Sequence, residues 1–205
     1  MKLRKILALV LVVLTLLVQN SYATDNSKDT SKYFEIEART LEKVGIIKGN
    51  KEKNLQLEAN LKRKDLPIII SRLYNEEEKA KKSTYKISFN DIKKDDYFYS
   101  YVAWAVEKKL IKGISDEEFG ANENVTIKEV EVILLRTLGY EEEAKTWNLI
   151  EPLSLSLGLR DGLNIESGKN PELNRGELSK LIVNALSIEC KGSTLKLKDI
   201  LNIDI

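Results

Sequence analysis

The chain has 205 residues, with 33 lysines and arginines against 32 aspartates and glutamates, no histidine and one cysteine. This near-neutral balance gives no support to nucleic-acid binding, which requires a basic face, and a single cysteine excludes an intrachain disulfide. The sequence has no Gly-rich phosphate loop, nucleophile elbow or metal-ligand spacing. Paired carboxylates, as in glycoside cleavage, remain an alternative, but so many acids form pairs by chance. We therefore predict a non-catalytic protein without a cofactor or metal.

Residues 1–23 are typical of a secretory signal peptide. A basic stretch at residues 2–5 precedes an apolar run from Ile6 to Val18, which is too short to span a bilayer comfortably. Small residues before Ala23 suit signal peptidase, so we expect cleavage after Ala23, with retention as an N-terminal anchor as the alternative. Removing the three basic residues of the leader leaves 30 basic residues against 32 acidic ones. An anionic ligand must then be met by local basic residues.

Residues 24–74 are predicted to form a first helix–loop–helix unit. After a polar lead-in, a helix from about Tyr33 to Val44 ends at the sequence Gly-Ile-Ile-Lys-Gly of residues 45–49. A second helix is expected to begin near Asp65, since Pro67 fits only in a first turn. Residues 75–88 form a charged connection, for which we weigh a solvated loop against a prolonged helix.

Residues 89–140 carry the clearest version of this pattern. Tyr97 and Tyr101 lie in the predicted first helix, and Gly113 is expected to end it in a left-handed conformation. The polar loop contains Phe119 as a core anchor, and the sequence Thr-Ile-Lys-Glu of residues 126–129 is predicted to open the second helix as a capping box. Sixteen residues separate Gly113 from Glu129, as they do Gly49 from Asp65. This equality indicates an internal repeat.

Residues 141–187 form a third, less regular unit. Pro152 is expected to kink or divide its first helix, and the sequence Gly-Leu-Arg-Asp-Gly of residues 158–162 ends it. The sequence Asn-Arg-Gly-Glu of residues 174–177 opens the second helix. Residues 188–205 are predicted to be a tail that packs back as a short helix or strand.

This order of parts resembles the S-layer homology (SLH) repeat. The repeat has the pattern Phe-x-Asp, an aromatic residue opening a helix, Gly-Ile-Ile-x-Gly, a loop aromatic and Thr-Arg-Ala-Glu. The resemblance covers about residues 33–187 and implies an all-α fold, a pseudo-threefold bundle of three helix–loop–helix SLH repeats. It also implies a secreted module of the cell wall or cell surface that binds pyruvylated secondary cell-wall polysaccharide. The pattern departs from the family at Ile127, which stands where the opener arginine belongs.

The helix openers are the candidate binding sites. A helix N-terminus offers unpaired amides and a positive dipole end, and Arg63 and Arg175 stand where the family arginine lies. A guanidinium in this place can grip a carboxylate through two hydrogen bonds. Further ligand-binding candidates are Lys62 for charge and Tyr97, Tyr101, Trp104 and Trp147 as stacking faces.

The structural alternatives stay open. Trp104 can belong to the core, and both arginines can form plain ion pairs. We expect one or two working pockets, with Arg63 more important than Arg175. The alternative function is that of an envelope adaptor, in which the helical array binds another protein.

Overall fold

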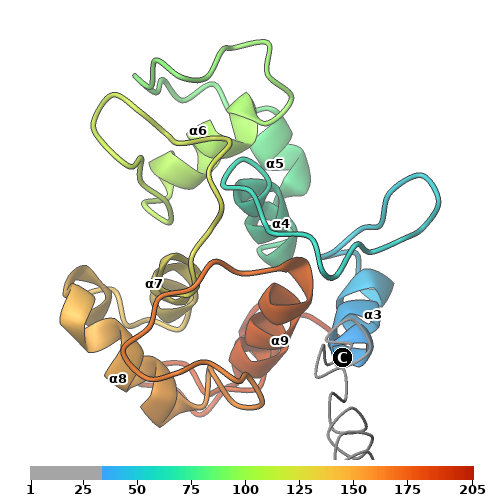
Figure 1. Cartoon of the computed structure of the whole chain (residues 1–205), viewed down its shortest axis with the longest axis vertical. Coiled ribbons are helices and arrows are strands. Elements are labelled where there is room, and N and C mark those ends of the chain that lie inside the picture. Colours follow the sequence, from blue (N-terminus) through green and yellow to red (C-terminus); the bar gives the residue numbers. More distant parts are fainter. Residues whose placement is uncertain (1–33) are drawn as a thin grey trace, which may run out of the picture. The chain divides into compact units, whose positions relative to one another are not determined.

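The computed structural model describes residues 34–205, so the predicted signal peptide and the polar lead-in lie outside the described residues. All regular elements of this part are helical, with isolated bridges and no strand, in agreement with the all-α prediction. No helix among residues 34–205 is long and apolar enough to cross a membrane. The elements are α3 (Glu35–Lys43), α4 (Leu66–Leu73), α5 (Glu77–Lys81), α6 (Tyr99–Glu107), α7 (Ile127–Thr137), the 3₁₀ helix η1 (Glu143–Lys145), α8 (Trp147–Leu157), α9 (Arg175–Leu186) and α10 (Leu197–Ile200) (Figure 1).

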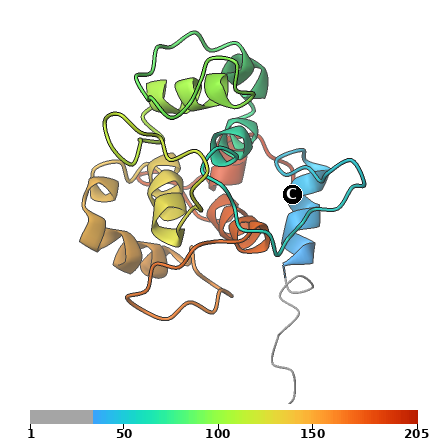
Figure 2. The same ribbon diagram turned by 45° about the horizontal axis from the view of Figure 1, so that its top comes forward.

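The helices pack in pairs around one hydrophobic core. Helix α3 lies against α9, although the two are far apart in sequence, and α4 packs against α5 and α6 (Figure 2). Helix α7 contacts α8 and α9, while α10 folds back onto α9. The tail therefore contains a short helix, one of the two forms predicted for it.

A closed ring of backbone hydrogen bonds joins the segments that precede α4, α7 and α9. The Leu61 amide donates to the Leu173 carbonyl (2.9 Å), the Leu173 amide to the Val125 carbonyl (2.8 Å), and the Val125 amide to the Leu61 carbonyl (2.8 Å). All three side chains are buried. Because buried backbone groups need partners, this ring fixes the three helix openers to one another.

The ends of the first helices correct one prediction. Lys109, not Gly113, takes the left-handed conformation after α6, with φ +59°, and Gly45 and Gly158 do the same after α3 and α8. Gly113 is needed for a different reason, because a Cβ there would lie 2.5 Å from the Phe89 ring and from two backbone oxygens. Close packing, not handedness, therefore excludes a side chain at Gly113.

Several boundaries test the other expectations. Helix α4 begins at Leu66 with Pro67 in its first turn, as predicted. Tyr97 lies two residues before α6 and not inside it. Helix α8 includes Pro152, and the break in this region falls at Thr146, between η1 and α8. The expectation that Pro152 would divide the element is therefore wrong in its position.

The charged connection is neither a prolonged helix nor a wholly solvated loop. It contains the separate helix α5, which packs against α4 and α6 and buries Ala80 completely. In residues 75–82, Ala80 is the one apolar residue among charged and polar ones, so the pattern indicated solvent exposure.

Candidate functional site

Backbone amides at the starts of α7 and α9, and in the segment just before α4, are used inside the protein. Three of them donate to loop carbonyls: Arg63 to Glu123 (3.0 Å), Ile127 to Pro171 (2.9 Å) and Arg175 to Ala59 (3.0 Å). The amides that follow donate as well: Lys64 to Ala121 (3.1 Å), Gly176 to Leu57 (2.9 Å) and Lys128 to the Asn170 side chain (3.0 Å). The amides at the starts of α7 and α9 that we expected to meet an anion are therefore occupied by neighbouring loops.

Both predicted caps involve the glutamate at the third helical position. The Glu129 carboxylate accepts hydrogen bonds from the Thr126 amide (2.8 Å) and hydroxyl (2.9 Å). Asn174 and Glu177 exchange reciprocal bonds of 2.8 and 3.0 Å, which completes the capping box of α9. These glutamates act as cap partners, as the predicted helix openers require.

Arg63 is buried and joins α4 to the loop after α6. Its Nε donates to the Phe119 carbonyl (3.0 Å), its Nη2 to the Lys112 carbonyl (2.9 Å), and its Nη1 pairs with Glu129. The side chain is only 8% exposed, and the guanidinium lies 5.1 Å from the centre of the Phe119 ring. Most of its donors are thus already used.

Arg175 repeats this arrangement at the loop after α3. Its Nε donates to the Leu55 carbonyl (2.8 Å) and its Nη2 to the Lys48 carbonyl (3.0 Å). Among residues 34–205 it has no carboxylate within 4 Å of its guanidinium. Burial lowers the pKa of Arg175, against the opposing effect of Asp65.

The predicted aromatic platforms divide into two groups. Tyr101 and Trp104 are 7% and 3% exposed, and the Trp104 indole donates to Glu76 (3.0 Å), so neither ring offers a face to a sugar. Tyr97 is 64% exposed, and its hydroxyl donates to Asp65 (2.9 Å). Burial, together with Asp65, raises the pKa of Tyr97 to about 12. Lys62 is half-buried and bridges to Asn124 through its backbone.

A cleft of about 570 Å³ lies beside α7, between the loop after α6 and the start of α8. We call it the α7 cleft. Its lining includes four basic side chains and two acidic ones, and Glu129, one of the acids, is paired with Arg63. Trp147 stands in the lining with half of its surface exposed. The residues that line the cleft include Arg63, Lys112, Gly113, Glu129, Arg136, Lys145 and Trp147.

Two cations of the α7 cleft, Lys112 and Arg136, form no ion pair among residues 34–205, whereas Arg63 pairs with Glu129 and Lys145 with Glu142. Arg136 donates through Nη1 to the carbonyls of Leu110 (2.9 Å) and Lys109 (3.2 Å), and burial lowers the pKa of its guanidinium, partly offset by Glu141. Within the described part of the chain, no carboxylate lies within 4 Å of the charged atoms of Arg136 or Lys112. Such a concave site attracts anions because its walls reduce screening.

Sequence reasoning missed Lys112 and Arg136 as site residues. A signal was present, since Lys112 and Arg136 are 24 residues apart, like Lys48 and Arg72 of the preceding unit. The matching pair of the following unit is Asp161 and Asn184, which are 23 residues apart and carry no positive charge.

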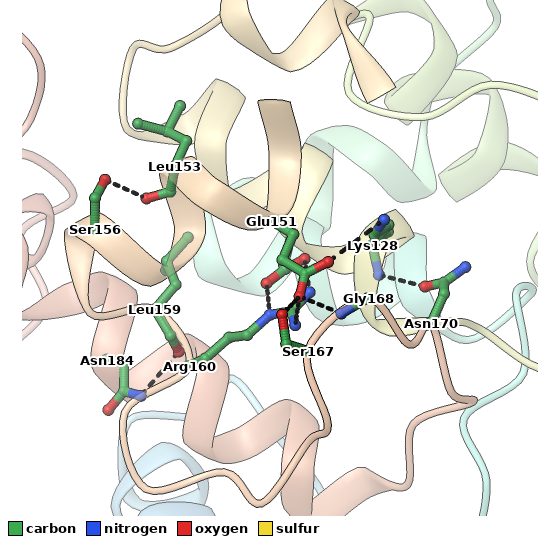
Figure 3. Close-up of polar contacts among 11 residues, drawn as sticks. Lys128, Glu151, Leu153, Ser156, Leu159, Arg160, Ser167, Gly168, Asn170 and Asn184 are labelled. Atoms are coloured by element: carbon green, nitrogen blue, oxygen red, sulfur yellow. Dashed lines mark hydrogen bonds and ion pairs between the residues drawn. The ribbon is translucent and has the colours of Figure 1, made fainter. Parts of the chain in front are cut away.

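A second polar cluster is closed to solvent. Arg160 donates from Nε and Nη2 to Glu131 (2.6 and 2.9 Å). Its Nη1 donates to Glu151 (3.3 Å) (Figure 3). Glu151 also accepts from the Gly168 amide (2.8 Å), which with Arg160 and Lys128 lowers its pKa against burial. Glu131 is fully buried, so these paired carboxylates hold the fold together and face no open site. Residues 34–205 contain no cluster of three or more potential metal-binding side chains.

The chain is similar in sequence to proteins named for the bacterial cell wall and surface layer. Residues 88–126 match the S-layer homology domain family. The chain is 25% identical over 167 residues to the middle cell wall protein of Brevibacillus brevis, covering 82% of this chain and 16% of that protein. It is 24% identical over 155 residues to the surface layer protein of Brevibacillus choshinensis, covering 74% and 13%. The chain thus spans less than a fifth of the length of these relatives.

Proposed function

We propose that the chain is a secreted, non-catalytic module that attaches to the cell wall by binding an anionic secondary cell-wall polysaccharide. In this proposal residues 24–74, 89–140 and 141–187 are three SLH repeats around a pseudo-threefold axis. The SLH match of the middle segment and the ring through Leu61, Val125 and Leu173 support this arrangement. The repeated carbonyl contacts of Arg63 and Arg175 support it further.

The observation that carries the binding proposal is that Lys112 and Arg136 in the α7 cleft form no ion pair among residues 34–205. Lys112 and Arg136 can both reach a carboxylate, such as a pyruvate ketal on a sugar, because charge-assisted hydrogen bonds to guanidinium are short and strong. The half-exposed Trp147 supplies an apolar surface for a sugar ring. Arg63 and Arg175 then act mainly by holding the loops that present Lys112 and Lys48. Tyr97 and Lys62 remain peripheral candidates.

Neutralising Lys112 should weaken polymer binding. Lys112→Gln removes one charge from the cleft without touching the Lys112 carbonyl that Arg63 uses, and we expect about a tenfold loss of affinity, since a hydrogen bond to a charged group contributes about 1.5–3 kcal/mol. Calorimetric titration with purified wall polymer, with and without its pyruvyl groups, measures this. Lys43→Gln on α3 is the control, because Lys43 is exposed and lies at the last turn of another helix. Undiminished binding by Lys112→Gln, or equal affinity for the depyruvylated polymer, would exclude this cleft as the carboxylate site.

An envelope adaptor is the second candidate. Leu149 and Leu155 on α8 are 47% and 51% exposed, which favours a contact with another protein more than with a sugar. Co-sedimentation of the chain with envelope fragments before and after digestion of the polymer separates the two functions. Retention after complete digestion supports the adaptor, whereas release supports polymer binding.

A further inference from the structure

Helix α5 places a carboxylate between two cations of the first unit. Glu77 Oε2 lies 3.1 Å from Lys48 Nζ, and Glu77 Oε1 lies 3.1 Å from Arg72 Nε. The side chains of Glu77 and Arg72 are 20% and 17% exposed, so this contact is largely screened from water. Glu77 thus bridges two basic groups with its two oxygens, as a bound carboxylate ligand would.

The two cations correspond to the pair that lines the α7 cleft. Lys48 and Lys112 each stand directly before a glycine that admits no side chain, and Arg72 and Arg136 lie 24 residues further on, near the ends of α4 and α7. The carbonyl of each lysine accepts a hydrogen bond from an opener arginine, Lys48 from Arg175 and Lys112 from Arg63. The two places therefore share their cations and their backbone support.

They differ in the carboxylate. In the α7 cleft, no carboxylate lies within 4 Å of the charged atoms of Lys112 or Arg136 among residues 34–205. In the first unit, the Glu77 carboxylate forms ion pairs with both Lys48 and Arg72. Desolvation acts to raise the pKa of Glu77, but Lys48 and Arg72 outweigh it and the pKa is lowered, so the carboxylate is ionised at neutral pH. The nearby Asp65 is engaged by the Tyr97 hydroxyl, while Lys81 lies 3.9 Å from Glu77.

We propose that Lys48 and Arg72 form a second, latent carboxylate site that α5 keeps closed with Glu77 as an internal ligand. This inference rests on the proposed function, since it assigns the anionic sugar carboxylate to the α7 cleft alone in the unaltered chain. Binding at the latent site requires the carboxylate of the ligand to replace that of Glu77. The inserted helix α5 thereby sets the stoichiometry at one ligand per chain.

Glu77→Gln tests the proposal by removing the internal charge at constant size. The probe is a methyl glycoside with a pyruvate ketal, and the same glycoside without the ketal is the ligand control. Calorimetry should give one site for the unaltered chain and two for Glu77→Gln. Glu78→Gln is the matched control, because Glu78 is the next residue of α5, is 74% exposed and pairs only with Lys81 among the described residues. It should leave one site.

Amide spectra of the ¹⁵N-labelled unaltered chain provide a measurement that needs no variant. The ketal should shift the Gly113 amide and the Trp147 indole and leave the Gly49 amide unmoved. Two sites in the unaltered chain, an equal shift at Gly49, or one site in a folded Glu77→Gln variant would each overturn the latent site. If only the Glu77→Gln variant bound the ketal, with a shift of its Gly49 amide, the latent site would be supported and the α7 cleft refuted as a binding site. An absence of binding by both proteins would overturn both proposals.

Discussion

Replacing Arg160 by methionine should lower the free energy of unfolding by about 3–5 kcal/mol, because it leaves buried carboxylates without their cation. Glu131 is fully buried, and both of its oxygens bind Arg160 at 2.6 and 2.9 Å. Glu151 keeps the Gly168 amide and the more distant Lys128 as partners, so most of the loss falls on Glu131. Urea denaturation followed by circular dichroism measures the change.

Arg39→Met is the control for the Arg160 prediction. Arg39 also contacts two carboxylates, Glu35 at 3.3 Å and Glu42 at 2.8 Å, but 49% of its side chain is exposed. Its loss should therefore change the free energy of unfolding far less than the loss of Arg160, because solvent screens both of its ion pairs. The double variant Arg160→Met with Glu131→Leu should recover part of the loss, because no charge then remains unpaired at position 131. Similar losses for Arg160→Met and Arg39→Met would show that burial does not strengthen the network.

The helices and their anchors could be predicted because their causes are local. Pro67 restricts the start of α4, Glu129 and Glu177 mark two helix openers, and the buried Phe119 and Leu55 stand at the same distance from their openers. The sequence contains each of these signals within a few residues. Periodicity and capping therefore predicted the element order well.

The site was harder to predict because it depends on contacts between distant segments. Arg63 and Arg175 have the sequence setting of surface arginines, yet their partners lie 49–127 residues away in the chain. The sequence alone allows Trp104 to be either a stacking platform or a core residue. The structure decides for the core, because the Trp104 indole donates to Glu76, the residue just before α5. Secondary-structure propensity reflects only neighbouring residues, so it does not indicate side-chain contacts between such distant segments.

One buried charge did leave a trace in the sequence. Glu131 lies one turn after Ile127 and one turn before Leu135, both fully buried, so it occupies a core position of α7. A charge at such a position requires a buried partner of opposite sign. The partner, Arg160, lies in a loop that the repeat pattern marked only as a helix stop.

Arg63 and Arg175 should differ in how much they stabilise the fold. Arg63→Ala should lower the free energy of unfolding by about 3 kcal/mol, because two loop carbonyls and the Glu129 carboxylate lose their donor in a buried place. Arg175→Ala should cost about 1–2 kcal/mol, because it frees two carbonyls and no carboxylate. Urea denaturation of both variants gives the difference.

Arg63→Lys decides whether charge or shape explains the loss. A lysine keeps the positive charge beside Glu129 but cannot donate to Phe119, Lys112 and Glu129 in the planar geometry of a guanidinium. It should therefore recover less than half of the stability lost in Arg63→Ala. Polymer affinity, measured on folded protein, should fall in both Arg63 variants, because the loop that presents Lys112 loses its support. A stable Arg63→Ala variant with full affinity would show that neither the loop nor the α7 cleft depends on this arginine.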